Sequence, residues 1–127
     1  MSPWEIDRSH ILAATRSAMR KALLELSPPP SCAVVDAVKP GGLPFPCLSV
    51  VRGDRISYAV AAASILAKTD RDRTMTELHR SYPQYGFAFH KGYGAAAHRQ
   101  ALKTYGPCPV HRLTFKTVVP RADERTS

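Results

Sequence analysis

The sequence predicts an α/β fold whose sheet is short of strands. Helical apolar patterns alternate with short apolar runs typical of strands, in the order helix, strand, strand, helix, loop, helix. The chain has 127 residues, 44% of them hydrophobic and 22% charged, which suits one globular domain with a modest core. We therefore expect a single domain over residues 1–120 and a loose polar tail over residues 121–127.

A long helix is predicted at the start of the chain. Ser2-Pro3-Trp4-Glu5 has the pattern of a capping box, with serine at the N-cap, proline at the first helical position and glutamate three residues after the cap. Apolar residues then recur at helical spacing as far as Leu26. Three consecutive prolines at positions 28–30 cannot continue a helix, so we expect it to end before them.

Two short strands are predicted next. Residues 32–36 form a continuous apolar run that ends at Asp36, and such runs are typical of strands buried on both faces of a parallel sheet. Residues 38–46 are rich in glycine and proline and predict a loop, after which residues 47–52 predict a second strand. Two strands alone leave both sheet edges unpaired, so the predicted sheet is incomplete.

Two further helices are predicted in the second half of the chain. The first covers residues 57–79; its beginning, residues 58–67, is apolar all round and rich in small side chains, which indicates a helix buried against a sheet. Its remainder is charged from Lys68 onward. A shorter helix over residues 95–105 is predicted to end at Gly106-Pro107.

The segment between these helices, residues 82–94, predicts a ligand-binding loop. It combines aromatic residues, glycines, His90 and Lys91 without a helical or strand period. Ordering such a loop is costly, so loops of this kind usually hold a ligand. Aromatic rings stack on sugars and bases, while cations and open backbone meet phosphates, so the composition suits a sugar-phosphate. The alternative is a rigid aromatic turn packed under a neighbouring helix.

The charge and the cysteine content indicate which kinds of partner and which cellular compartment to expect. The net charge is +8, with cations spread from Arg52 to Lys116, which favours a polyanionic partner such as nucleic acid. A solvated basic surface is the alternative. Three widely spaced cysteines without a Cys-x-x-Cys pair, and no His-Glu-x-x-His motif, argue against a zinc site or disulfide framework. With no apolar run of membrane-spanning length, we expect a cytoplasmic protein with reduced thiols and no membrane partner.

Asp36 and Asp72 are the acids that helix capping and solvent exposure explain least well. Asp36 ends a predicted strand, where α/β proteins commonly bind ligands, and Asp72 lies in the charged half of a predicted helix. If the two carboxylates converge, their oxygens suit Mg²⁺ or Mn²⁺. The alternatives are a turn-forming Asp36 bonded to its own loop, and an Asp72 paired with Lys68 or Arg73.

Several of these segments, in the same order, resemble ribonuclease HII, the endonuclease that cuts RNA in RNA–DNA hybrids and incises DNA at single ribonucleotides. The resemblance covers nearly the whole chain. It is carried by Glu5-Ile6-Asp7-Arg8, Val34-Val35-Asp36, Gly53-Asp54, Ala61-Ala62-Ala63-Ser64-Ile65-Leu66-Ala67-Lys68, Arg71-Asp72-Arg73, Tyr82-Pro83-Gln84-Tyr85-Gly86-Phe87, His90-Lys91-Gly92-Tyr93-Gly94 with His98, Tyr105-Gly106-Pro107 and His111-Arg112-Leu113-Thr114-Phe115.

The resemblance implies a ribonuclease H-like fold and a site for two divalent metals, Mg²⁺ or Mn²⁺, held by four carboxylates. Asp36 matches the third carboxylate and Asp72 the fourth, so both are expected to be catalytic metal ligands. Tyr93 matches the tyrosine that stacks on the sugar at the RNA-to-DNA junction. The residues expected to bind substrate are Tyr93, Lys91, His90 and Lys68.

The chain departs from the family pattern at its beginning. The Asp-Glu-Ala-Gly-Arg-Gly motif that carries the first two carboxylates has no match in this sequence, nor do the opening strands of the ribonuclease H sheet. We therefore expect a truncated ribonuclease H-like fold that lacks its first strands, is monomeric if intact, and is nearly inactive alone. The alternatives are a non-catalytic basic nucleic-acid-binding fragment, and a chain that works only with a complementing N-terminal fragment.

Overall fold

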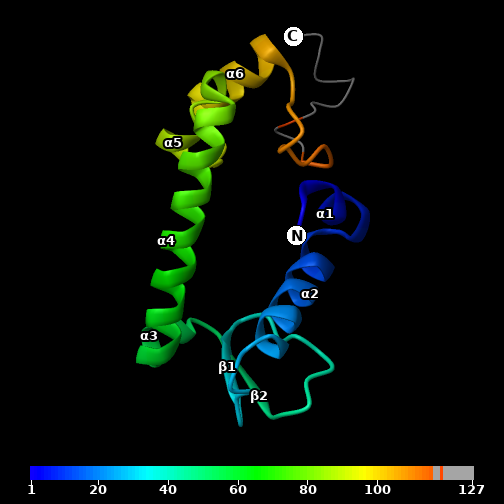
Figure 1. Cartoon of the computed structure of the whole chain (residues 1–127), viewed down its shortest axis with the longest axis vertical. Helices are drawn as coiled ribbons and strands as arrows, with labels where there is room; N and C mark the ends of the chain where they lie inside the picture. Colours follow the sequence, from blue (N-terminus) through cyan, green and yellow to red (C-terminus); the bar gives the residue numbers. More distant parts are fainter. Residues whose placement is uncertain (116–117, 119–127) are drawn as a thin grey trace. The chain divides into compact units, whose positions relative to one another are not determined.

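The computed structural model describes residues 1–115 and 118, and it confirms the α/β prediction (Figure 1). The predicted tail at residues 121–127, and Lys116, lie outside the described residues. Two compact units are present: Met1 with Arg8–Ala67, and Ser2–Asp7 with the chain from Lys68 onward. The elements are α1 (Pro3–Ser9), α2 (Ile11–Leu24), β1 (Ala33–Asp36), β2 (Cys47–Val50), α3 (Gly53–Ile56), α4 (Tyr58–Ser81), the 3₁₀ turn η1 (Pro83–Tyr85), α5 (Phe87–His90) and α6 (Ala96–Tyr105).

The start of α1 confirms the predicted capping box. The Ser2 backbone N–H donates to Glu5 Oε2 at 2.6 Å, and the Glu5 N–H donates to Ser2 Oγ at 3.3 Å. The single long helix, however, is wrong, because His10 separates α1 from α2 with φ 62° and ψ 150°. The helical hydrogen bonds restart from the His10 carbonyl, which accepts from the Ala14 N–H at 3.0 Å. The apolar spacing continues across this break, so periodicity gave no sign of it.

β1 and β2 form the predicted parallel pair, with Ala33 opposite Cys47 and Asp36 opposite Val50. The expectation that β1 is buried on both faces is wrong. Val35 is buried, whereas Val34 is 43% exposed beside its register partner Leu48, which is 62% exposed. The reason is the size of the sheet: among the described residues it has two strands, and one of its faces stays open.

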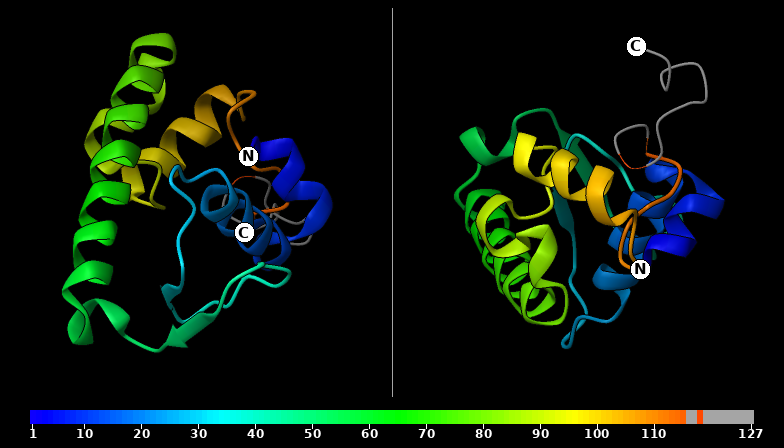
Figure 2. Two further views of the ribbon diagram at one scale, coloured as in Figure 1. Left: turned by 60° about the horizontal axis from the view of Figure 1, so that its bottom comes forward. Right: turned by 90° about the horizontal axis from the view of Figure 1, so that it is seen from above.

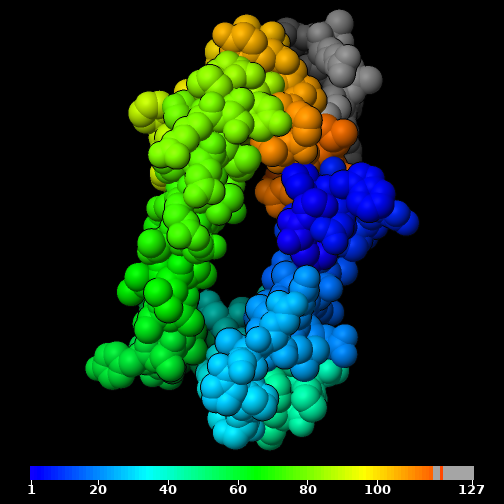
Figure 3. Space-filling model, viewed as in Figure 1, coloured from blue at the N-terminus to red at the C-terminus, as the bar shows by residue number. Residues whose placement is uncertain are grey.

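The first half of α4 differs from its prediction in the same way. Of the residues between Tyr58 and Ala67, Val60 is the one that is buried, whereas Tyr58, Ile65 and Leu66 are each more than 60% exposed. This part of the helix, coloured green, shows an uncovered surface in the space-filling view (Figure 3). A two-stranded sheet is too small to cover a helix that is apolar all round, so the predicted burial is absent.

The second unit is built around an aromatic core from the predicted loop. Tyr85 and Phe87 are each 3% exposed, and their rings stack with centroids 5.6 Å apart. They pack with Ala101 and Leu102 of α6, which lies beside the end of α4 together with α5 (Figure 2). The Tyr85 hydroxyl donates to the Gly106 carbonyl at 2.7 Å, just past the end of α6. This end confirms the prediction, since Gly106 has φ +71°.

Asp7 ties the start of the chain to the second unit. Its carboxylate accepts hydrogen bonds from the Leu113 N–H at 2.7 Å, the Thr114 N–H at 3.2 Å and the Thr114 hydroxyl at 2.6 Å. The Thr114 hydroxyl, with these backbone donors, lowers the pKa of Asp7 from its usual value. Residues 2–7 therefore belong with the C-terminal half of the chain, although the sequence indicates only a helix start there.

The state of the cysteines and the lengths of the helices can be compared with the expectations of reduced thiols and no membrane-spanning segment. Cys32, Cys47 and Cys108 are free thiols, and burial raises the pKa of Cys108, which keeps that thiol protonated at neutral pH. Within the described part of the chain, no helix is both long enough and apolar enough to cross a bilayer.

Helix α5 offers a matched test of this core. Phe87 is 3% exposed and Phe89, two residues along, is 85% exposed. We expect Phe87→Ala to lower the free energy of unfolding by about 3 kcal/mol or more, because it leaves a cavity among Tyr85, Ala101 and Leu102. Phe89→Ala should lower it by less than about 1 kcal/mol. Urea unfolding followed by circular dichroism measures both, and equal losses would contradict the assigned core.

Candidate functional site

Asp36 stands at the end of β1, where the sequence predicted a ligand. Its Oδ1 accepts a hydrogen bond from the Gly53 backbone N–H at 2.9 Å, so the carboxylate is held by the first residue of α3 and not by its own loop. The approach is close: a Cβ on Gly53 would lie 3.3 Å from Val60 Cγ1 and 3.7 Å from Asp36 Oδ1. A larger residue at position 53 would therefore be tight against Val60, beside the N–H that holds the carboxylate.

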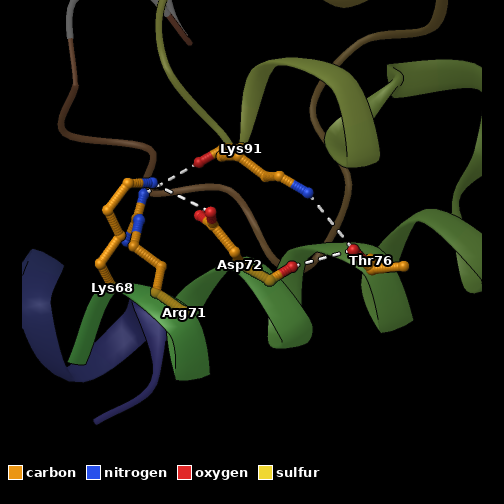
Figure 4. Close-up of polar contacts among 5 residues, drawn as sticks. All are labelled: Lys68, Arg71, Asp72, Thr76 and Lys91. Carbon is orange, nitrogen blue, oxygen red and sulfur yellow. Dashed lines mark hydrogen bonds and ion pairs between the residues drawn. The ribbon is translucent and has the colours of Figure 1, made fainter. Parts of the chain in front are cut away.

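Asp72 lies in the middle of α4, within the second unit. Its Oδ2 forms an ion pair with Lys68 Nζ at 2.9 Å, one helical turn earlier, which was one of the alternatives left open by the sequence. One turn later, the Thr76 hydroxyl donates to the Asp72 backbone carbonyl at 2.9 Å. Lys68, Asp72 and Thr76 thus share one face of the helix (Figure 4).

The loop after α5 lies against this face. Lys91 Nζ donates to Thr76 Oγ1 at 3.3 Å, and Arg71 Nη2 donates to the Lys91 carbonyl at 3.1 Å (Figure 4). The next aromatic residue, Tyr93, is 63% exposed and has its ring centroid 5.6 Å from the Arg71 guanidinium carbon. An acid, two lysines, an arginine and an exposed ring therefore gather on one side of α4.

The segment at residues 82–94 has features of both structures that the sequence allowed, a packed aromatic turn and a loop with exposed residues for a ligand. Tyr85 and Phe87 are core residues, as expected for a packed aromatic turn, whereas Phe89 and Tyr93 are exposed. His90 supports the loop, because its Nε2 lies 2.6 Å from the Tyr85 carbonyl and its Nδ1 accepts from the Gly92 N–H at 3.2 Å. A direct contact between His90 and substrate stays a prediction.

The two predicted metal ligands, Asp36 and Asp72, belong to different units of the chain. Asp72 is grouped with Lys68, Lys91 and Tyr93 in the second unit, and Asp36 belongs to the first unit, so their convergence stays a prediction. Within the described residues, no group of three or more histidine, cysteine or acidic side chains comes together as a ligand set. Each carboxylate alone fits a hard cation, and Asp72 already accepts the ammonium of Lys68.

Comparison with known protein families shows to which family this chain belongs. The model of the family described as ribonuclease HII matches residues 1–118. The chain belongs to the ribonuclease HII family. This confirms the resemblance that the sequence motifs carried, from the helix entry at residues 5–8 to the last motif at residues 111–115.

Curated ribonuclease HII proteins are similar to most of this chain. The chain is 51% identical to that of Caldanaerobacter subterraneus subsp. tengcongensis over 111 residues, which are 87% of this chain and 46% of the relative. It is 50% identical to that of Syntrophotalea carbinolica over 117 residues, 92% of this chain and 56% of the relative. For Roseiflexus castenholzii the identity is 53% over 111 residues, 87% and 50%. The chain spans about half the length of the curated relatives it matches.

A buried histidine relay in this ribonuclease HII chain was missed by the sequence reasoning. His98 and His111 are 6% and 7% exposed, and their Nε2 atoms lie 3.0 Å apart. The far side of His98, Nδ1, lies 3.1 Å from the Tyr93 carbonyl, and the His111 Nδ1 accepts from the Cys108 N–H at 3.0 Å. His90 stacks on His98 with ring centroids 4.4 Å apart.

The hydrogen bonds of this relay are all satisfied when both imidazoles are neutral. A carbonyl only accepts, so His98 donates from Nδ1 to Tyr93 and its Nε2 must accept from the Nε2–H of His111. His111 then has Nδ1 free to accept from Cys108. With His111 in this tautomer, a second proton on His98 would set its Nε2–H against the Nε2–H of His111. No spacing rule in the sequence marks this arrangement, because the partners come from three separate segments.

Burial lowers the pKa of both His98 and His111 below the usual value of 6.5. The unfolded chain therefore takes up these protons more readily than the folded one as the pH falls below about 6.5. The stability that the relay contributes is fully present above that pH and is lost on acidification. Since the relay ends on the Tyr93 carbonyl, acid is expected to loosen the residue with the exposed ring.

We expect the unfolding free energy to fall by up to about 1.4 kcal/mol per pH unit for each of these histidines below pH of about 6.5. His98→Gln should be less stable at neutral pH and should show a shallower pH dependence. His10→Asn, a change at an exposed histidine, is the control and should keep the original slope. Urea unfolding at several pH values measures this, and an unchanged slope in His98→Gln would rule out the relay as the cause.

Proposed function

We propose that this chain forms part of a metal-dependent endonuclease that hydrolyses RNA in RNA–DNA hybrids and incises DNA at ribonucleotides. Its carboxylates for Mg²⁺ or Mn²⁺ would be Asp36 and Asp72, whose oxygen donors suit hard divalent ions. Such ions, when bound, activate water and stabilise the leaving oxygen. A monomeric state and a cytoplasmic location remain parts of this proposal.

The grouping on one side of α4 is the observation that supports this function most directly. Asp72 lies among Lys68, Arg71 and Lys91, next to the exposed ring of Tyr93. Cations of this kind neutralise the phosphates of a nucleic-acid strand, and an exposed aromatic ring stacks on a sugar or base. Membership of the ribonuclease HII family supports RNA as a component of the substrate strand, because the relatives are named as ribonucleases.

The residues divide the work by their chemistry. Lys68 and Lys91 would bind and orient the phosphates, and Tyr93 would stack on the sugar at the RNA-to-DNA junction. The 2′-hydroxyl of ribose is the group that distinguishes RNA from DNA at such a site. In this scheme a divalent ion would take the place of Lys68 at the Asp72 carboxylate, and the ammonium would then be available to a phosphate.

A non-catalytic nucleic-acid binder is the second candidate. One observation favours it: the carboxylate of Asp72 is already paired with Lys68. The cations and the ring of Tyr93 would remain useful to such a protein without any metal. Binding that is independent of Mg²⁺, falls steeply with salt and leads to no cleavage would favour this candidate.

Substitution of Tyr93 tests the binding surface. We expect Tyr93→Ala to weaken binding of an RNA–DNA hybrid by about 1–3 kcal/mol, because one aromatic stacking partner is lost. Tyr58→Ala removes a 97% exposed tyrosine outside the loop and is the matched control, with little expected effect. Fluorescence anisotropy at fixed salt measures both affinities. Equal losses in the two variants would remove Tyr93 from the interface.

Cleavage tests the catalytic part. Because the chain matches only two of the four family carboxylates, we expect the purified 127-residue protein to cut a hybrid very slowly with Mg²⁺ or Mn²⁺. Any residual cleavage should disappear in Asp36→Asn and in Asp72→Asn. Addition of a separately expressed N-terminal part of a relative should raise the rate if the missing carboxylates are the limitation. Rapid cleavage by the chain alone would contradict the half-set of ligands.

A further inference from the structure

Arg71 contacts the substrate loop, and beyond its positive charge neither the sequence motifs nor the proposed function gives it a role of its own. It immediately precedes Asp72 in α4, and its Nη2 donates to the Lys91 carbonyl at 3.1 Å, across 20 positions of the chain. The same guanidinium lies over the ring of Tyr93, 5.6 Å from the centroid. Figure 4 shows Arg71 reaching from the helix to the backbone of Lys91.

The backbone that Arg71 contacts needs external support. Lys91 has φ 51° and Gly92 has φ +77°, so two consecutive residues are left-handed, and for a lysine this conformation is costly. The turn is also pressed against α4: a Cβ on Gly92 would lie 3.4 Å from Met75 Sδ and 3.6 Å from Arg71 Nη2. Arg71 and Met75 are one turn apart, so they form the helix face on which the turn rests.

We propose that Arg71 is a positioning residue that fixes the turn at residues 91–93 and thereby orients the Tyr93 ring for the substrate. The inference rests on the proposed function for what Tyr93 binds, whereas the contact itself does not depend on it. A guanidinium carries several N–H donors on a delocalised cation, so it donates to the Lys91 carbonyl while its carbon lies over the Tyr93 ring, 5.6 Å from the centroid. A lysine ammonium is not delocalised and cannot make both contacts in the same way.

Comparison with two nearby arginines, Arg73 and Arg112, shows that the contacts of Arg71 do more than add positive charge. Arg73 carries the same charge two residues away, but it pairs with Asp70 at 2.9 Å within the helix. Arg112, stacked on Phe115 with its guanidinium carbon 3.9 Å from the centroid, has a pKa lowered by burial and then by the charge of Arg71. Arg71 and Arg112 are thus close enough for their like charges to repel.

Hydrogen–deuterium exchange tests the contact without any ligand. The N–H groups of Lys91, Gly92 and Tyr93 are bonded within the loop, to the Phe87 carbonyl, His90 Nδ1 and the His90 carbonyl. We expect Arg71→Ala to speed exchange of the peptide covering residues 90–94 at least about fivefold, because the turn opens more often. Arg71→Lys should behave like Arg71→Ala, and Arg73→Ala, the matched control, should leave this exchange unchanged. Unchanged exchange in Arg71→Ala overturns the inference.

A double-mutant cycle on hybrid binding then tests the orientation of Tyr93. Arg71→Ala should weaken binding more than Arg73→Ala in the otherwise unchanged chain, and only as much as Arg73→Ala in the Tyr93→Ala background. Additive losses would mean that Arg71 acts on the substrate by itself and would overturn the positioning role. If the unaltered chain does not prefer a hybrid over a DNA duplex, the proposed function fails, and the exchange measurement still decides whether Arg71 holds the turn.

Discussion

The packing of Tyr85 and Phe87 beneath α6 is the interaction on which the second unit depends. These two rings exclude water from one end of a loop whose other end carries the exposed ring of Tyr93. The His111 ring packs against Tyr85 and Phe87 at the first end. Its hydrogen-bonded partner His98 reaches the Tyr93 carbonyl at the other end, so the two histidines connect both ends of the loop. A loop that is costly to order is thus stabilised by burying its first aromatic residues.

Charge on α4 is arranged around one acid. Asp72 has a partner one turn earlier in Lys68, and the loop brings Lys91 to Thr76 one turn later. An exposed pair of this kind contributes little to stability, so the arrangement is better understood as a means of keeping a carboxylate and several cations side by side.

The first unit presents apolar surface that the described residues do not cover. Val34 and Leu48 are exposed together on one sheet face, and Ile65 and Leu66 are exposed on α4. The curated relatives are about twice as long as the matched segment. The open face and the greater length of the relatives agree with the shortage of strands inferred from the helix and strand patterns.

Sequence alone determined what depends on neighbours along the chain. The capping box at Ser2 and Glu5, the end of α6 at Gly106 and the parallel strand that ends at Asp36 all follow from local chemistry or from short apolar runs. The family was also readable from the order of the motifs. These features needed no knowledge of contacts between distant residues.

Only the tertiary structure decided what depends on distant partners. It broke the first helix at His10, exposed the apolar half of α4, and placed Gly53 against Asp36. It also brought Arg71 to Lys91. Burial and hydrogen bonding of this kind depend on which segments pack against each other. The periodicity of one segment carries no information about the identity of the segment that packs against it.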